Sequence, residues 1–283
     1  MNIAYNEATA SKCSTLEQDL LLCEQAGFEY IEIRFDMLEA YLEHHTLAEL
    51  AAFFRSSRLK PHALNALYIP GELMAGQGWQ SFADRFLYAC HYARVIGSGH
   101  VILVSPMNAD RKMPYQRPWD QVRLRCGEVL EKLSDLAEDS GTNICFELVG
   151  AEYSGVRNIR QARSIVEGVG SQRAGYVFDS FNIFMDRDFK GFKELEQIPA
   201  KRIFMVHVND SDTGHRPGLT QENRCFCGPH HIDLGGFMDS LKRAGYNGPV
   251  SIEVFRPEYW KRPAGEVIEE AYRTTGNVLG PWL

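Results

Sequence analysis

The stretch Val250–Trp260, VSIEVFRPEYW, decides the fold that we predict for this chain. It begins as an apolar, β-leaning run typical of a buried strand, and it carries Glu253 near the end of that run. A polar loop with Arg256 and Glu258 follows directly. The segment therefore places one ionisable side chain where a strand ends.

Three earlier segments repeat this design. ICFELVG carries Glu147, GYVFDSFN carries Asp179 and RIFMVHVND carries His207, each near the end of an apolar run. In a parallel barrel, the C-terminal ends of all strands open onto one face. We therefore expect two glutamates, one aspartate and one histidine to converge on that face.

The rest of the chain supports alternating strands and helices. An amphipathic run, a glycine and a short β-rich run recur in this order, as in EQAGFEYIEIR, RVIGSGHVILV and KRAGYNGPVSIEV. Glycine after a helix supplies a left-handed C-cap, and the following run suits a strand buried on both faces. Alternation of this kind indicates a parallel sheet. We expect eight strands, near Ile3–Asn6, Tyr30–Arg34, His62–Asn65, His100–Val104, Ile144–Glu147, Tyr176–Asp179, Ile203–His207 and Val250–Glu253.

Helical patterns lie between these strands, among them Leu16–Ala26, Leu47–Ser56, Trp119–Ser140 and Phe237–Ala244. Eight such units predict an α/β fold, a (β/α)8 TIM barrel, which commonly fills about 250 residues as one domain. We expect a single domain over residues 1–283. The rival is a doubly wound open sheet, but that fold usually has a Gly-rich turn after its first strand, and here the turn reads NEATASKC. The polar stretch Asp210–His231 is expected to be an irregular functional loop.

The composition is that of an ordinary globular protein, with 283 residues, 45% hydrophobic and 24% charged. The net charge of −7 argues against nucleic-acid or membrane partners, because both attract basic proteins. No run approaches the roughly 18 apolar residues of a membrane span, and MNIAYNEAT lacks the features of a secretory signal. The seven scattered cysteines indicate reduced thiols, so we expect a cytoplasmic protein.

Three carboxylates in one low-dielectric cavity repel one another unless a proton or a cation neutralises them. One divalent metal ion held by Glu147, Asp179, His207 and Glu253 would remove this repulsion. Three oxygen ligands and one imidazole suit Mn²⁺, Mg²⁺ or Co²⁺, and they also admit Zn²⁺. The alternative is that each acidic residue caps a helix or pairs with an arginine.

A metal with open positions can chelate a ketone oxygen and the neighbouring hydroxyl, which acidifies the carbon between them. One carboxylate can then take that proton, and a second can return it elsewhere on the enediol. The residues thus predict isomerisation or epimerisation of a hydroxy-ketone without an organic cofactor. Hydrolysis stays open, because a metal also activates water.

The chain resembles the xylose-isomerase-like TIM barrel superfamily nearly from end to end. The resemblance is carried by NEAT, DLLLCEQAGFEYIEIR, KPHALNAL, FELVG, FDSFN, DLGGFMDSLKRAGY and IEVFRPEYW. Within the superfamily it is closest to the enzymes that isomerise inosose (2-keto-myo-inositol) in inositol catabolism. The resemblance implies a small-molecule ketocyclitol or ketosugar substrate, and members often form homodimers. It also implies Glu147, Asp179, His207 and Glu253 as metal ligands, with Glu147 and Glu253 as the acid/base pair.

The resemblance also suggests substrate contacts. Arg224, in RCFCG, resembles the substrate-orienting arginine of the family. Asn182 stands where the family usually has histidine, and Cys227–Asp233 departs from the usual P-G-x-G-x-I-D pattern, so both changes bear on the substrate. Further candidates, which could instead close hydrogen bonds at the barrel mouth or cap loops, are Arg34, Asn65, Asp210 and Arg256.

Several other functions use similar sites. Rivals on the same barrel are a ketose 3-epimerase, a hydroxypyruvate-type isomerase and a sugar-acid dehydratase, and a rival of another class is a non-catalytic sugar-binding barrel. An apurinic-site endonuclease is disfavoured, because Asn182 replaces a histidine that its zinc cluster needs and the net charge does not attract DNA.

Overall fold

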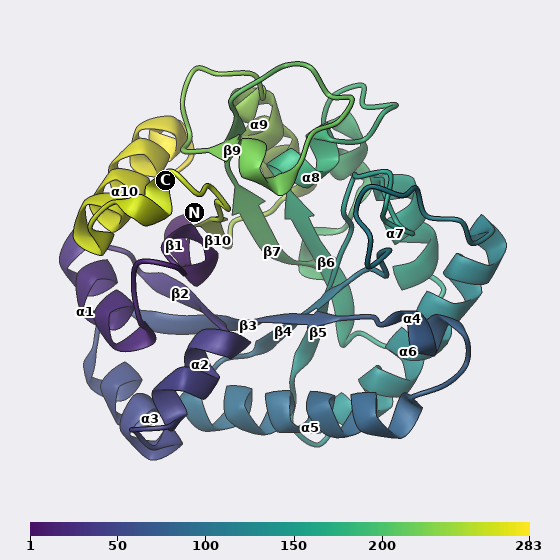
Figure 1. Ribbon diagram of the computed structural model, residues 1–283, viewed down its shortest axis with the longest axis horizontal. Helices are drawn as coiled ribbons and strands as arrows, with labels where there is room; N and C mark the ends of the chain where they lie inside the picture. Colours follow the sequence, from purple (N-terminus) through teal and green to yellow (C-terminus); the bar gives the residue numbers. More distant parts are fainter.

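Eight parallel strands form a closed barrel surrounded by helices, as the computed structural model of residues 1–283 shows (Figure 1). Around the barrel the strands follow the chain, with β10 closing the ring between β7 and β1. The predicted (β/α)8 fold is confirmed. The barrel strands are β1 (Asn2–Asn6), β2 (Tyr30–Arg34), β3 (Lys60–Tyr68), β4 (His100–Val104), β5 (Asn143–Glu147), β6 (Ala174–Asp179), β7 (Ile203–Val208) and β10 (Pro249–Ile252).

Each barrel strand is followed by at least one α-helix, and these helices form the outer layer (Figure 1). They are α1 (Leu16–Ala26), α2 (Phe35–Leu42), α3 (Leu47–Ser56), α4 (Gly71–Met74), α5 (Trp79–Ile96), α6 (Trp119–Ala137), α7 (Ile159–Val166), α8 (Ser180–Phe184), α9 (Leu234–Ala244) and α10 (Ala264–Leu279). None of them is long and apolar enough to span a bilayer.

The helix ends follow the capping chemistry read from the sequence. Thr15 caps the N-terminus of α1 through its side chain, and Gly27 ends the helix in the left-handed region, at a φ of 103°. Asp233 and Gly245, with a φ of 89°, have the same two roles in α9. Residues with a side chain rarely adopt this conformation, which is why glycine recurs between a helix and the next strand.

The structure corrects some predicted boundaries. Strand β3 is longer than His62–Asn65, α6 ends at Ala137 rather than Ser140, and Glu253 is the first residue after β10. The stretch Asp210–His231 is more ordered than expected, because β8 (Asp210–Ser211) pairs antiparallel with β9 (Arg224–Cys225). This backbone pairing joins the two ends of a long loop and so fixes the position of β9 above the barrel.

Most of the interior is apolar, with 80 buried hydrophobic residues in one cluster between the barrel and its helices. The inside of the barrel is different near the C-terminal ends of the strands. There Asn6, Glu32, Asn65 and His207 are buried polar side chains carried by four different strands. Buried polar groups require partners, and in this barrel they find them in one another.

Candidate metal centre

Four ionisable side chains converge at the C-terminal end of the barrel. Glu147 and Asp179 are the last residues of β5 and β6, His207 is the penultimate residue of β7, and Glu253 follows β10. One potential ligand atom of each lies within 4.8 Å of the other three, and all four residues are buried. The structure thus brings together the four residues that the strand ends indicated.

The orientation of His207 shows where a cation fits. Its Nδ1 makes no hydrogen bond. This atom lies 3.3 Å from Glu253 Oε2, 3.5 Å from Glu147 Oε1 and 3.8 Å from Asp179 Oδ2. One imidazole nitrogen facing three carboxylate oxygens is a donor set suited to a divalent metal ion. The residues present therefore fit a metal centre with one nitrogen and three oxygen ligands.

The charges of the cluster affect the two glutamates in opposite directions. Burial raises the pKa of Glu147 to about 7, although His207 opposes this effect. Burial also disfavours the charge of Glu253, but the positive charges of His207 and Arg224 outweigh it and hold the pKa of Glu253 well below its usual value. Environment thus separates the protonation preferences of two identical side chains.

Arg224 is buried beside the four residues and ties two of them together. Its Nη1 donates to Asp179 Oδ2 and to Glu253 Oε2, both over 2.8 Å. The rings of Phe181 and Phe255 flank the guanidinium at 5.4 and 5.2 Å. Charge-assisted bonds in a dry environment are strong, so this arginine is firmly placed.

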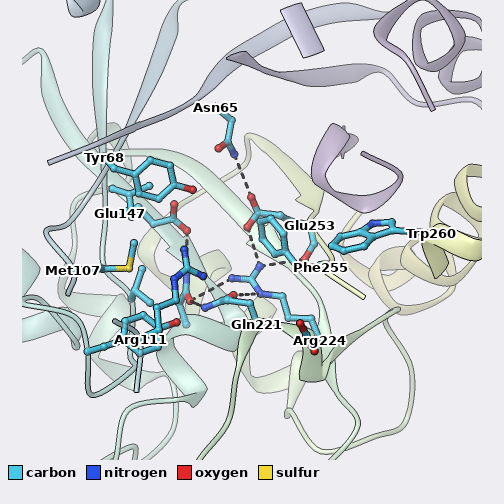
Figure 2. A pocket seen from close by; sticks show the side chains of 15 residues that line it. Asn65, Tyr68, Met107, Arg111, Glu147, Gln221, Arg224, Glu253, Phe255 and Trp260 are labelled. Atoms are coloured by element: carbon cyan, nitrogen blue, oxygen red, sulfur yellow. Dashed lines mark hydrogen bonds and ion pairs between the residues drawn. The ribbon is translucent and has the colours of Figure 1, made fainter. Parts of the chain in front are cut away.

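A cavity of about 220 Å³ opens next to the cluster (Figure 2). Among the four converging residues, Glu147 and Glu253 line this cavity, and Asp179 and His207 do not. A small molecule in the cavity would therefore meet the two glutamates. The remaining walls are formed by Asn65, Tyr68, Val104, Met107, Arg111, Val149, Tyr153, Asn182, Gln221, Glu222, Arg224, Phe255 and Trp260.

The family profile described as xylose isomerase-like TIM barrel matches residues 20–275, which include all four converging residues. The chain belongs to this xylose isomerase-like family.

Two curated relatives and one solved structure illustrate the similarity. Inosose isomerase from Bacillus velezensis is 38% identical over 284 residues, covering 100% of this chain and 99% of the relative. Inosose isomerase from Bacillus subtilis strain 168 is 35% identical with the same coverage. A crystal structure of the IolI protein with a bound zinc atom has a TM-score of 0.91 and 34% identity, covering 100% of this chain and 99% of that one. The similarity thus spans the whole barrel.

In this member of the xylose isomerase-like family, three of the six predicted substrate contacts line the cavity: Asn65, Asn182 and Arg224. Asn182 donates from Nδ2 to Glu147 Oε1 over 3.0 Å. Figure 2 shows Asn65 and Arg224 directed toward Glu253 from different sides. These three residues are therefore placed to meet a ligand.

The other three predicted contacts do not line the cavity and have their polar groups engaged elsewhere. Arg34 pairs with Asp36 at 2.9 Å. Asp210 accepts hydrogen bonds from backbone N–H groups, including that of Ile232 at 2.9 Å, and so caps its loop. Arg256 pairs with Asp212 at 2.8 Å. Each of the three is engaged by a partner outside the cavity, so the structure does not bring them to the cavity wall.

Two polar residues behind the cluster were missed in the sequence. Glu32 Oε2 lies 3.0 Å from His207 Nε2, and Asn209 donates to Asp179 Oδ2 over 3.0 Å. The available signal for Glu32 was an acidic residue between two isoleucines, Ile31 and Ile33, within a short strand. Arg111 reaches the cavity from a turn and Gln221 from the single-turn 3₁₀ helix Gln221–Asn223, and neither segment is long enough for periodicity to indicate the direction of a side chain.

Proposed function

We propose that this family member is a divalent-metal-dependent inosose isomerase, which converts 2-keto-myo-inositol into an isomeric inosose. The observation that carries the proposal is that Glu147 and Glu253, alone among the four clustered residues, line the cavity. Full-length similarity to inosose isomerases of two Bacillus species supports this choice of substrate.

The two glutamates would act as acid and base at neighbouring ring carbons. One carboxylate removes the proton from the carbon that bears the hydroxyl next to the ketone, which leaves an enediolate. A proton then returns to the former carbonyl carbon, while the neighbouring hydroxyl passes its proton to the former ketone oxygen and becomes the new ketone. The reaction neither gains nor loses atoms, so it requires no organic cofactor.

A divalent cation held by Glu147, Asp179, His207 and Glu253 would polarise the ketone oxygen and acidify the adjoining C–H bond. Glu147 and Glu253 differ from the other two proposed metal ligands because they also line the cavity in which a substrate would bind.

The shape and lining of the cavity favour a small hydroxylated ring. Its volume of about 220 Å³ is below the roughly 300–1,000 Å³ of drug-sized pockets, which favours a compact ligand. Arg224 and Asn182 offer N–H groups for ring hydroxyls. The aromatic residues Tyr68, Phe255 and Trp260 would cover the C–H faces and exclude water from the enediolate.

We further propose Mn²⁺, Mg²⁺, Co²⁺ or Zn²⁺ as the resident cation. The bound zinc atom in the structurally similar IolI protein makes zinc the first ion to test. Elemental analysis of the protein as purified identifies the ion. All seven cysteines are free, and six are buried, which suits a reducing compartment; we propose the cytoplasm.

The decisive experiment is proton exchange in D₂O followed by NMR. Metal-reconstituted protein is incubated with 2-keto-myo-inositol and, separately, with ketohexoses. We expect deuterium to enter next to the carbonyl of the inosose, an isomeric inosose to accumulate, and both signals to disappear when a chelator removes the metal.

Glu147→Gln and Glu253→Gln serve as matched variants, because each keeps the shape of the side chain and removes its capacity to take up a proton as a base. Full turnover by either variant contradicts the acid/base assignment. If deuterium enters a ketohexose and not the inosose, the protein is a ketose epimerase instead of an inosose isomerase. Binding without exchange of any compound supports a non-catalytic barrel.

A further inference from the structure

The two ring nitrogens of His207 have different surroundings. Nδ1 faces the three carboxylates of the cluster without a hydrogen bond, and Nε2 lies 3.0 Å from Glu32 Oε2. A neutral imidazole ligand binds a metal through the nitrogen that lacks a proton, and the other nitrogen then donates a hydrogen bond. The positions of the partners thus assign the proton to Nε2 and metal binding to Nδ1.

Glu32 is also tied to a second proposed ligand. The side-chain nitrogen of Asn6 donates to Glu32 Oε2 over 3.2 Å and to Glu253 Oε1 over 2.9 Å. Asn65 repeats this bridge, with distances of 3.4 and 3.2 Å to the same two oxygens. Glu253 Oε1 therefore accepts from two amide donors, whereas Oε2 accepts from Arg224 Nη1 over 2.8 Å and lies 3.3 Å from His207 Nδ1.

We propose that Glu32 is a positioning residue of the metal centre, which holds His207 with Nδ1 toward the cation and, through Asn6 and Asn65, holds Glu253 with Oε2 toward it. The inference rests on the metal centre of the proposed function but not on the identity of the substrate. It assigns a role to a residue that does not line the cavity.

The burial of Glu32 favours a positioning role over the alternative that its side chain only fills space inside the barrel. Its side chain is 0% exposed on strand β2, with Ile31 and Ile33 beside it in sequence. A buried carboxylate without a compensating partner is costly. The two asparagines supply neutral donors, and His207 is the ionisable group in direct contact with it. An apolar side chain would fill the space without this cost, but it could not accept the proton of Nε2.

The first test uses the wild-type protein. Protein with ¹⁵N-labelled histidine is loaded with ¹¹³Cd²⁺, whose coupling reports the ligating nitrogen directly, so no assignment of the nine histidines is needed. We expect one histidine to couple to cadmium through Nδ1 and to carry a slowly exchanging proton on Nε2. Coupling through Nε2, or no coupled histidine in cadmium-loaded protein, would overturn the proposal.

The second test compares carboxylate-to-amide variants. Glu32→Gln is measured beside Asp19→Asn, which alters another fully buried carboxylate, on α1 outside the barrel. Affinity for Co²⁺ is obtained by competition with a chelator, and the visible spectrum of bound Co²⁺ reports ligand geometry.

We expect Glu32→Gln to bind Co²⁺ about 10- to 100-fold more weakly than wild type, with an altered spectrum, and Asp19→Asn to retain both wild-type values. A folded Glu32→Gln protein with wild-type affinity and spectrum would overturn the proposal, as would equal weakening in both variants. If Glu32→Gln does not fold, the cadmium experiment still decides. Neither measurement uses an inosose, so a failure of the proposed reaction is a separate result.

Discussion

Asn182 donates a hydrogen bond from its Nδ2 to Glu147 Oε1, 3.0 Å away. Its Oδ1 accepts from Arg224 Nη2 at 3.3 Å and from Gln221 Nε2 at 3.2 Å. One amide thus links a proposed acid/base glutamate to the buried guanidinium. Asn182 is therefore part of the polar network around the cavity.

Replacing Asn182 by alanine should lower kcat at saturating metal by about tenfold or more. The change removes the amide partner of Glu147 Oε1 and of Arg224 Nη2, and an unsatisfied buried group costs about 1–3 kcal/mol. Initial rates measured beside the melting temperature separate catalysis from folding. Asn277→Ala, on an exposed face of α10, is the control and should keep the wild-type rate. Wild-type kcat in Asn182→Ala would contradict a role for this network.

The Arg224→Met variant should be much less stable without metal than with it. Loss of the guanidinium leaves the carboxylates of Asp179 and Glu253 unpaired, and breaking a buried ion pair costs about 3–5 kcal/mol. A divalent cation would neutralise the same carboxylates, so added Zn²⁺ should raise the melting temperature of this variant more than that of wild type. The exposed pair of Arg243 with Glu196 provides the control, because Arg243→Met should change neither value appreciably. An equal response to Zn²⁺ in wild type and Arg224→Met would contradict the prediction.

Gly150→Ala should displace the backbone that carries Asn182 and so lower both stability and turnover. A methyl group at this position would overlap the backbone oxygen of Asn182 and come within 2.7 Å of the backbone nitrogen of Asp186. Neither backbone atom can move without shifting α8, so we expect a loss of about 1–3 kcal/mol in stability together with a large loss of turnover. Gly99→Ala, where a methyl group meets nothing within 4 Å, is the matched control. Chemical denaturation and initial rates test both variants, and a fully active Gly150→Ala protein would show that the contact is relieved elsewhere.

The buried carboxyl group of Asp19 predicts a pH-dependent stability. Burial raises its pKa from 3.8 to about 7. Between these two values the folded state retains a proton that the unfolded chain has released, so this group lowers the free energy of unfolding as the pH rises through that window. The loss is at most about 1.4 kcal/mol per pH unit.

Asp19→Asn removes this titration. Relative to wild type, the variant should therefore gain stability between about pH 5 and about pH 7, as measured by urea denaturation at both values. Most other groups are shared and cancel in the difference between the two proteins. Glu7 is the exception, because burial and, after it, the charge of Asp19 raise the pKa of Glu7, so the difference reports the titration of this pair. A difference that does not change with pH would show that Asp19 has an ordinary pKa in the folded protein.

The part of the site that could be predicted from the sequence depends on strand ends. Glu147, Asp179 and His207 each follow an apolar run, and the geometry of a parallel barrel brings such positions together whatever the loops do. The fold itself was predictable for the same reason, because glycine caps and buried runs alternate in a local pattern. The predictions for these residues required no knowledge of distant contacts.

The remainder depends on long-range contacts. Arg34 and Asn65 both lie near strand ends, yet Arg34 turns to Asp36 while Asn65 faces Glu253. Sequence position does not distinguish the two, since the choice depends on which partner the fold brings within reach. The role of Arg224 was indicated by resemblance alone, and the β8–β9 pairing that holds this residue joins positions 13 and 15 residues apart in the sequence.

The hydrogen bond between Asn6 and Glu253 joins residues 247 positions apart, from β1 and from the end of β10. Closing a loop of this length carries an entropy cost, which the contacts made by β10 must offset. A barrel in which β10 had not paired with β1 and β7 would hold three of the four proposed ligands beside an open edge of the sheet. Metal uptake during biosynthesis should therefore follow barrel closure. A nascent chain that still lacks β10 should bind the cation more weakly than the complete protein.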